Sequence, residues 1–169
     1  MMRDLVAGAG SPLRADDGLG VRLVNDLATW IEERGGDARD IGTDACALVA
    51  ELEERRRVII IDAVEMELSP GDVRVFDAEC VPQCSTPMLS GHEFDLASAV
   101  TLARKLHPDV RIEIVGIQPA SVERERRFSP EIAARYFAIR KEVKNRLGVM
   151  LARTEEAERL VKPVQEERR

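Results

Sequence analysis

The chain is short of several features that define common protein classes. Its 169 residues contain two histidines and three cysteines, and no apolar run is long enough to cross a bilayer. The apolar stretch at residues 5–10 is interrupted by glycines and is shorter than a secretory signal requires. An odd number of cysteines without such a signal indicates reduced thiols rather than a disulfide framework. We therefore expect a cytoplasmic protein that does not insert into a membrane.

Positive charge and aromatic residues are also scarce. The formal net charge is −6, and aromatic residues make up 4% of the chain. No basic stripe with interleaved aromatic residues is present, and the arginines within residues 123–127 alternate with glutamates. This pattern argues against binding to nucleic acid or to an anionic membrane.

The small number of histidines narrows the choice of catalytic groups. His92 begins a segment like the HExxH motif of zinc proteases, but Leu96 stands where the second histidine is required. His107 is followed by a proline at the end of a predicted helix, and no GxSxG motif is present. Cys80 and Cys84 do not have the CxxC spacing of zinc or redox sites. The sequence therefore indicates neither a serine or cysteine nucleophile nor a closed zinc site.

What the sequence does contain is an alternation of strand-like and helix-like segments. Residues 1–148 are predicted to form one α/β domain, since this length suits a single core and 44% of the chain is hydrophobic. Residues 149–169 are highly charged and are predicted to form a tail, either a helical extension or a disordered segment. The predicted strands are residues 3–8, 37–41, 57–63, 73–76 and 110–117, and the predicted helices are residues 18–34, 43–56, 94–106 and 129–147.

Two of these strands indicate how the sheet is built. Residues 58–61 form a continuous β-branched run, which is typical of a central parallel strand covered on both faces. The strand at 73–76 follows after a connection too short for a helical crossover, so it is predicted to run antiparallel. The sequence thus predicts a three-layer α/β sandwich: a mostly parallel, five-stranded twisted sheet with one antiparallel edge strand and helices on both faces.

Three side chains are predicted to meet beyond the carboxyl ends of the parallel strands. Ligands of open parallel sheets bind beyond the carboxyl ends of the strands. Asp17 follows the first strand, Asp62 ends the isoleucine-rich strand, and His92 lies at the start of the third helix. Two carboxylates and an imidazole with open coordination positions suit nickel, zinc, manganese or iron. Such a metal polarises a peptide carbonyl and activates water, so the set indicates metal-assisted hydrolysis.

Each of these residues also has a purely structural interpretation. Asp17 is suited to cap the first helix, Asp62 to end a strand, and His92 to lie in an exposed loop. A different function is suggested by Gly8 and Gly10, which resemble the start of a dinucleotide-binding GxGxxG turn. However, the third glycine is missing, and the first helix begins too late to point its amides at a pyrophosphate. At the level of the sequence these alternatives stay open.

Five short segments carry chemically distinctive residues in a fixed order. They are Gly8–Val21 with its acidic pair, residues 40–43 (Asp-Ile-Gly-Thr), residues 60–63 (Ile-Ile-Asp-Ala), residues 90–93 (Ser-Gly-His-Glu) and residues 116–119 (Gly-Ile-Gln-Pro). In this order they resemble the hydrogenase maturation proteases, and the resemblance covers roughly residues 3–147. Five ordered matches are far more specific than any one of them.

The resemblance implies a mixed α/β fold and an endopeptidase. Its substrate would be a hydrogenase large-subunit precursor, whose C-terminal extension is removed once nickel has been inserted. Carried over by position, Asp17, Asp62 and His92 would contact the metal and act in catalysis, and Asp16 would cap or orient without binding. Nickel would arrive with the substrate, although other divalent metals would also fit. We expect the protease to be a monomer.

Two departures from the family pattern bear on this resemblance. Ser11 replaces the asparagine that usually follows the second glycine. Ile41 replaces a glycine of the DGGT-like loop, which should be stiffer as a result and puts the choice of partner in question. Asp40, Gly42 and Thr43 of this loop are the predicted substrate-binding residues. A relative that binds an immature subunit without cutting it, and a nucleotide-binding α/β enzyme, are the alternatives left open.

Overall fold

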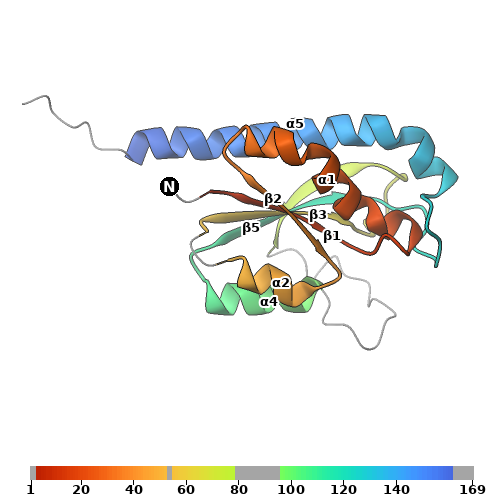
Figure 1. Ribbon diagram of the computed structural model, residues 1–169, viewed down its shortest axis with the longest axis horizontal. Coiled ribbons are helices and arrows are strands. Elements are labelled where there is room, and N and C mark those ends of the chain that lie inside the picture. The colour runs from red at the N-terminus through yellow and green to blue at the C-terminus, as the bar shows by residue number, and fades with distance from the viewer. Residues whose placement is uncertain (1–2, 53–54, 79–95, 162–169) are drawn as a thin grey trace, which may run out of the picture.

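The protein forms a five-stranded sheet covered by helices on both faces (Figure 1). The computed structural model describes residues 3–52, 55–78 and 96–161. Within these ranges the strand order is β2-β1-β3-β5-β4. The strands are β1 (Leu5–Ala9), β2 (Asp37–Gly42), β3 (Arg57–Ala63), β4 (Val73–Asp77) and β5 (Arg111–Ile117). The predicted three-layer α/β architecture is confirmed.

All strands of the sheet run parallel except the edge strand β4. β1 pairs in parallel with β2 and β3, and β3 pairs in parallel with β5. β4 pairs antiparallel with β5, with Val73 opposite Ile117. This direction confirms the prediction, because the connection from Ala63 to Val73 leaves no room for a helical crossover. The buried run Val58–Ile61 lies in β3 between two parallel neighbours, as its composition predicts.

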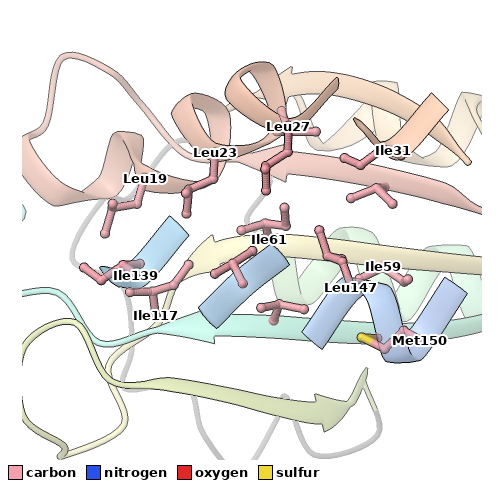
Figure 2. Packing of buried hydrophobic residues seen from close by; sticks show 14 of the residues in the cluster. Leu19, Leu23, Leu27, Ile31, Ile59, Ile61, Ile117, Ile139, Leu147 and Met150 are labelled. Carbon is pink, nitrogen blue, oxygen red and sulfur yellow. The ribbon is translucent and has the colours of Figure 1, made fainter. Parts of the chain in front are cut away.

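In the described part of the chain, α-helices cover both faces of the sheet (Figure 1). The helices are α1 (Leu19–Glu32), α2 (Ala45–Ala50), α4 (Leu96–Leu106) and α5 (Pro130–Val161). α1 and α5 lie on one face, where Leu27 and Leu147 pack with Ile59 and Ile61 of β3 (Figure 2). α2 and α4 lie on the other face, which receives Ile60. Alternation of side chains along β3 thus supplies both cores from one strand.

Helix α5 is longer than the sequence predicts. The helix does not end near Leu147 but continues to Val161, which agrees with the helical-extension alternative for the first part of the tail. Gly148 does not end the helix because it lies against the ring of Trp30, and Met150 beyond it is buried in the core. Neither α5, with its 32 residues, nor any other helix in the described ranges is both long and apolar enough to span a bilayer.

Helix α2 is shorter than its predicted span of residues 43–56. Its first turn is capped by Asp44, whose Oδ1 atom accepts a hydrogen bond of 3.2 Å from the amide of Ala47. The helix ends at Ala50. Arg55, which the sequence pattern places in the helix, instead forms an ion pair with Asp37 of β2. The chain has therefore left the helix before it enters β3.

Close packing of α1 brings its first turn to the carboxyl ends of the strands. A Cβ atom at Gly20 would lie 2.1 Å from the carbonyl oxygen of Ile61 and 2.4 Å from that of Ala9. A Cβ atom at Gly8 would lie 2.3 Å from the carbonyl oxygen of Gly20. Only glycine permits this approach. The contact places the 3-10 turn η1 (Ala15–Gly18), which leads into α1, next to the end of β3.

Candidate active site

The predicted site lies at the edge of the sheet where the parallel strands end. β1 and β3 are neighbours, so the turn that carries Asp17 lies beside Asp62 near the end of β3. The two carboxyl groups are close enough for the charge of Asp17 to raise the pKa of Asp62. The structure therefore brings two of the three predicted residues together. His92 lies outside the described residues, and its place at the site stays a prediction.

Asp17 is held in a tight turn and does not cap the first helix. Its Oδ2 atom accepts a hydrogen bond of 2.8 Å from the amide of Ser11. Gly10 makes this turn feasible, because its φ is +110° and a Cβ atom there would lie 1.8 Å from the carbonyl oxygen of Asp17. The cap of α1 is Gly18, and no side chain caps the helix. The structural interpretation of Asp17 as a helix cap is therefore wrong.

Asp62 has strongly altered acidity. It is partly buried, and its Oδ1 atom accepts a hydrogen bond of 2.8 Å from the amide of Ala63. Burial, and after it the negative charge of Asp17, raises the pKa of Asp62 to about 8, while the bond from Ala63 acts in the opposite direction. In the absence of a cation, Asp62 therefore holds a proton at neutral pH. Such a shift between paired carboxyl groups is typical of functional sites.

The paired carboxyl groups suit a divalent cation. Their mutual repulsion is relieved when a cation binds to both, and hard oxygen ligands suit divalent metals. In residues 3–52, 55–78 and 96–161, no cluster of three or more histidine, cysteine, aspartate or glutamate side chains forms a metal site. Asp17 and Asp62 could supply two oxygen ligands to such a cation, and any further ligand would come from elsewhere.

The raised pKa of Asp62 predicts that the metal-free protein loses stability as the pH rises. Below about pH 4 the carboxyl group is protonated in both the folded and the unfolded state, whereas between about pH 4 and about pH 8 only the folded state keeps the proton. The free energy of unfolding should then fall by up to about 1.4 kcal/mol per pH unit and level off above this window. Urea denaturation of the wild type and Asp62→Asn in a chelating buffer measures the effect. Parallel profiles for the two proteins would contradict it.

The predicted substrate-binding loop lies at the same edge, where β2 ends. Asp40 accepts a hydrogen bond of 2.9 Å from the amide of Gly42, which has a left-handed φ of 51°. The carbonyl of Gly42 accepts a bond of 2.8 Å from the amide of Gly10, so the loop is attached to the turn that holds Asp17. The side chains of Asp40 and Thr43 are exposed.

The geometry of the glycine turn is unsuited to a dinucleotide. α1 begins only at Leu19, after the 3-10 turn, so its first amides do not follow directly on Gly10. Asp40 stands where a ribose-binding acid would, but its two oxygen atoms are bonded to the amide of Gly42 and, at 3.2 Å, to the side chain of Asn25. Both observations disfavour the nucleotide-binding alternative.

Two buried polar side chains at this edge bind neighbouring loops, and the sequence alone does not reveal their partners. Asp16 is fully buried and accepts four hydrogen bonds from residues of the β5–α5 connection. Gln118, at the end of β5, binds the β3–β4 loop through its side chain. The acidic pair and the Gln-Pro pair are the only local signals. The partners begin 104 and 50 residues away along the chain.

Comparison with known proteins gives consistent matches. A family model described as hydrogenase maturation protease matches residues 21–146. The chain is 31% identical over 136 residues to the Hydrogenase 2 maturation protease of Escherichia coli strain K12, covering 79% of this chain and 83% of that protein. It is 32% identical over 124 residues to the hydrogenase expression/formation protein HupD of Rhizobium leguminosarum bv. viciae, covering 72% of this chain and 61% of that protein.

Solved structures match over a similar length. The hydrogenase maturating endopeptidase HybD from E. coli has a TM-score of 0.69 and 27% sequence identity, covering 88% of this chain and 94% of that one. The hydrogenase 2 maturation peptidase from Thaumarchaeota archaeon SCGC_AB-539-E09 has a TM-score of 0.61 and 31% identity, covering 86% and 98%. The fold and the sequence therefore point to the same relatives.

Proposed function

The chain belongs to the hydrogenase maturation protease family, and we propose that it removes the C-terminal extension of a nickel-loaded hydrogenase large-subunit precursor. The observation that carries this proposal is the pair of electrostatically coupled carboxyl groups, Asp17 and Asp62, at the carboxyl edge of the sheet. The reaction is the hydrolysis of one peptide bond. We place it in the cytoplasm and expect the protease to act as a monomer.

In this proposal Asp17 and Asp62 bind the metal that the substrate brings, and His92 completes the set. Asp62 would release the proton on its carboxyl group to the solvent when it binds a cation, because the cation would replace the proton in relieving the repulsion from Asp17. A divalent metal at this position supplies a Lewis acid that polarises the scissile carbonyl and makes water more acidic. Nickel is thus part of the substrate, and other divalent metals fit the same oxygen ligands.

The loop of Asp40, Gly42 and Thr43 is well placed to contact the peptide that approaches the site. It is attached to the turn of Asp17 through the bond between the Gly10 amide and the Gly42 carbonyl. Its exposed side chains lie at the same edge of the sheet as the carboxylates. Ile41 is buried in the hydrophobic core, and this burial anchors the loop. It supports the expectation that the loop is stiff.

The proposal is tested with a large-subunit precursor prepared with and without nickel. We expect cleavage of the nickel-loaded precursor only, with the metal-free precursor left intact in the same assay. Mass spectrometry of the products identifies the bond that is cut. Tight binding of the precursor without cutting would instead favour the non-catalytic, chaperone-like relative. If the protein neither binds nor cuts the precursor, the assignment of this substrate is refuted.

A further inference from the structure

Two residues at the carboxyl edge adopt a backbone conformation that is rare for residues with a side chain. Ala15 has a φ of 44° and Glu67 a φ of 57°, and no other non-glycine residue in the described ranges has a positive φ. Ala15 belongs to the turn that carries Asp17, and Glu67 belongs to the loop that follows Asp62. Such conformations are strained and persist only where the surrounding contacts impose them.

The contacts that impose the first conformation come from the β5–α5 connection, residues 118–129. The amide of Ala15 donates to the carbonyl of Glu125 at 2.6 Å, and the amide of Asp16 donates to the carbonyl of Ser121 at 3.0 Å. The buried carboxylate of Asp16 accepts bonds of 2.8–2.9 Å from three backbone amides of the connection and from the hydroxyl of Ser129. The turn of Asp17 is therefore fixed to this connection at several points.

The second strained residue is held by the same connection. The Oε1 atom of Gln118 accepts hydrogen bonds from the amides of Met66, at 2.8 Å, and Leu68, at 3.2 Å, on either side of Glu67. Its Nε2 atom donates to Glu65 at 2.8 Å and to the neighbouring prolyl carbonyl at 3.0 Å. Gln118 is buried, and three of the four hydrogen bonds of its side chain hold the loop that follows Asp62.

We propose that Asp16 and Gln118 are positioning residues, which from one shared connection set the placement of the Asp17 and Asp62 carboxylates relative to each other. The two carboxylates follow different strands, and the connection is the element that binds both of their loops. The catalytic consequence rests on the proposed function, because a displacement of about 1 Å in a metal site can lower a rate about a hundredfold. The structural consequence can be measured in the isolated protein.

Two variants and two matched controls test this proposal. Asp16→Asn keeps the size of the side chain, but its amide nitrogen is a donor and cannot accept the hydrogen bonds that the carboxylate oxygen at that position accepts. Gln118→Met keeps the length of the side chain and removes its four hydrogen bonds. Ser129→Ala is the control for the first variant, because it removes the hydroxyl that caps α5 but leaves the backbone bonds to Asp16. Glu65→Gln is the control for the second, because the bonds to Oε1 of Gln118 are kept.

Hydrogen exchange at two amides reports the carboxylate positions directly. The amide of Ser11 donates to Asp17, and the amide of Ala63 donates to Asp62. We expect exchange to become at least about tenfold faster at Ser11 in Asp16→Asn and at Ala63 in Gln118→Met, with no such change in the controls. Unchanged exchange in both variants would refute the proposal. The proposal would also be refuted if a control variant that loses as much thermal stability showed an equal increase in exchange rate at the same amide.

Cleavage kinetics separate this inference from the proposed function. In both variants kcat for precursor cleavage should fall about 10–100-fold with KM unchanged, as is typical for residues that orient metal ligands. Normal kcat in variants with altered exchange would refute the catalytic role of the positioning. A wild-type protein that cuts no precursor would refute the proposed function alone, since the exchange measurements still decide whether Asp16 and Gln118 position the carboxylates.

Discussion

Asparagine in place of Asp62 is expected to lower kcat/KM for precursor cleavage by about 10³-fold. Lewis-acid polarisation by a metal contributes several kcal/mol to transition-state stabilisation, and each 1.4 kcal/mol or so corresponds to a tenfold change in rate. Asparagine keeps the size of the side chain but cannot provide the negative charge that binds a cation together with Asp17. The same loss is expected for Asp17→Asn and for His92→Ala.

The stability of the variant distinguishes a catalytic role from a structural one. Burial and the charge of Asp17 disfavour ionisation of Asp62, so a neutral amide there should leave the metal-free protein at least as stable as the wild type at neutral pH. Cleavage rates and thermal unfolding are measured on the same samples. Asp109→Asn is the matched control, because Asp109 is exposed and precedes β5 at the opposite edge. Cleavage by Asp62→Asn within about tenfold of the wild type would exclude Asp62 from the catalytic site.

The sheet is predictable from the sequence because its signals are local. A continuous β-branched run from Val58 to Ile61 specifies a strand covered on both faces, and that is the position of β3. The short connection between Ala63 and Val73 fixes the direction of β4 for a steric reason. The adjacency of β1 and β3 is less local, since it depends on the strand order expected for this class of sheet.

Helix ends are less predictable because distant contacts decide them. Gly148 is a weak helix former, and the sequence around it becomes highly charged, so the local pattern predicts an end. In the structure Gly148 packs against Trp30, and Met150 adds to the core on the same face of the sheet. Burial of apolar surface outweighs the low propensity of one glycine, and α5 continues.

The positions of the two carboxyl groups in the candidate site could be predicted from the sequence, but their burial and acidity could not. Asp17 and Asp62 follow from the rule that ligands bind beyond the carboxyl ends of parallel strands. The raised pKa of Asp62 depends on its burial and on its separation from Asp17, which no local pattern encodes. The partners of Asp16 and Gln118 are equally distant in sequence, so their part in holding the site becomes visible only in the folded chain.

The opposite edge of the sheet also contains a charged cluster, but its role is structural. Arg57, the first residue of β3, lies 2.6 Å from Asp4 and 3.6 Å from Glu113, and all three side chains are buried. Arg57 also donates a hydrogen bond to the carbonyl of Met150 in α5. One cation thus links the residue before β1, strand β5 and the terminal helix at the edge where no part of the candidate site lies.

Methionine in place of Arg57 is expected to destabilise the protein by about 3–5 kcal/mol. The variant removes the buried cation that Asp4 and Glu113 share, and Glu113 keeps its pair with Arg111, whose side chain is exposed. Removing one partner of a buried ion pair typically costs this much. For a chain of this size the melting temperature should fall by roughly 10 °C. Urea denaturation at neutral pH gives the free energy, and thermal unfolding gives the second value.

The matched control for this variant is Arg146→Met. Arg146 pairs with Glu142 at 2.7 Å on the exposed side of α5, where such a pair contributes at most about 1 kcal/mol. Equal losses of stability in the two variants would contradict the structural role of the Arg57 cluster. Because the cluster and the Asp17–Asp62 pair lie at opposite edges, the folded fraction of Arg57→Met should keep the wild-type kcat/KM. Stability and chemistry would then depend on different ends of the same three strands, β1, β3 and β5.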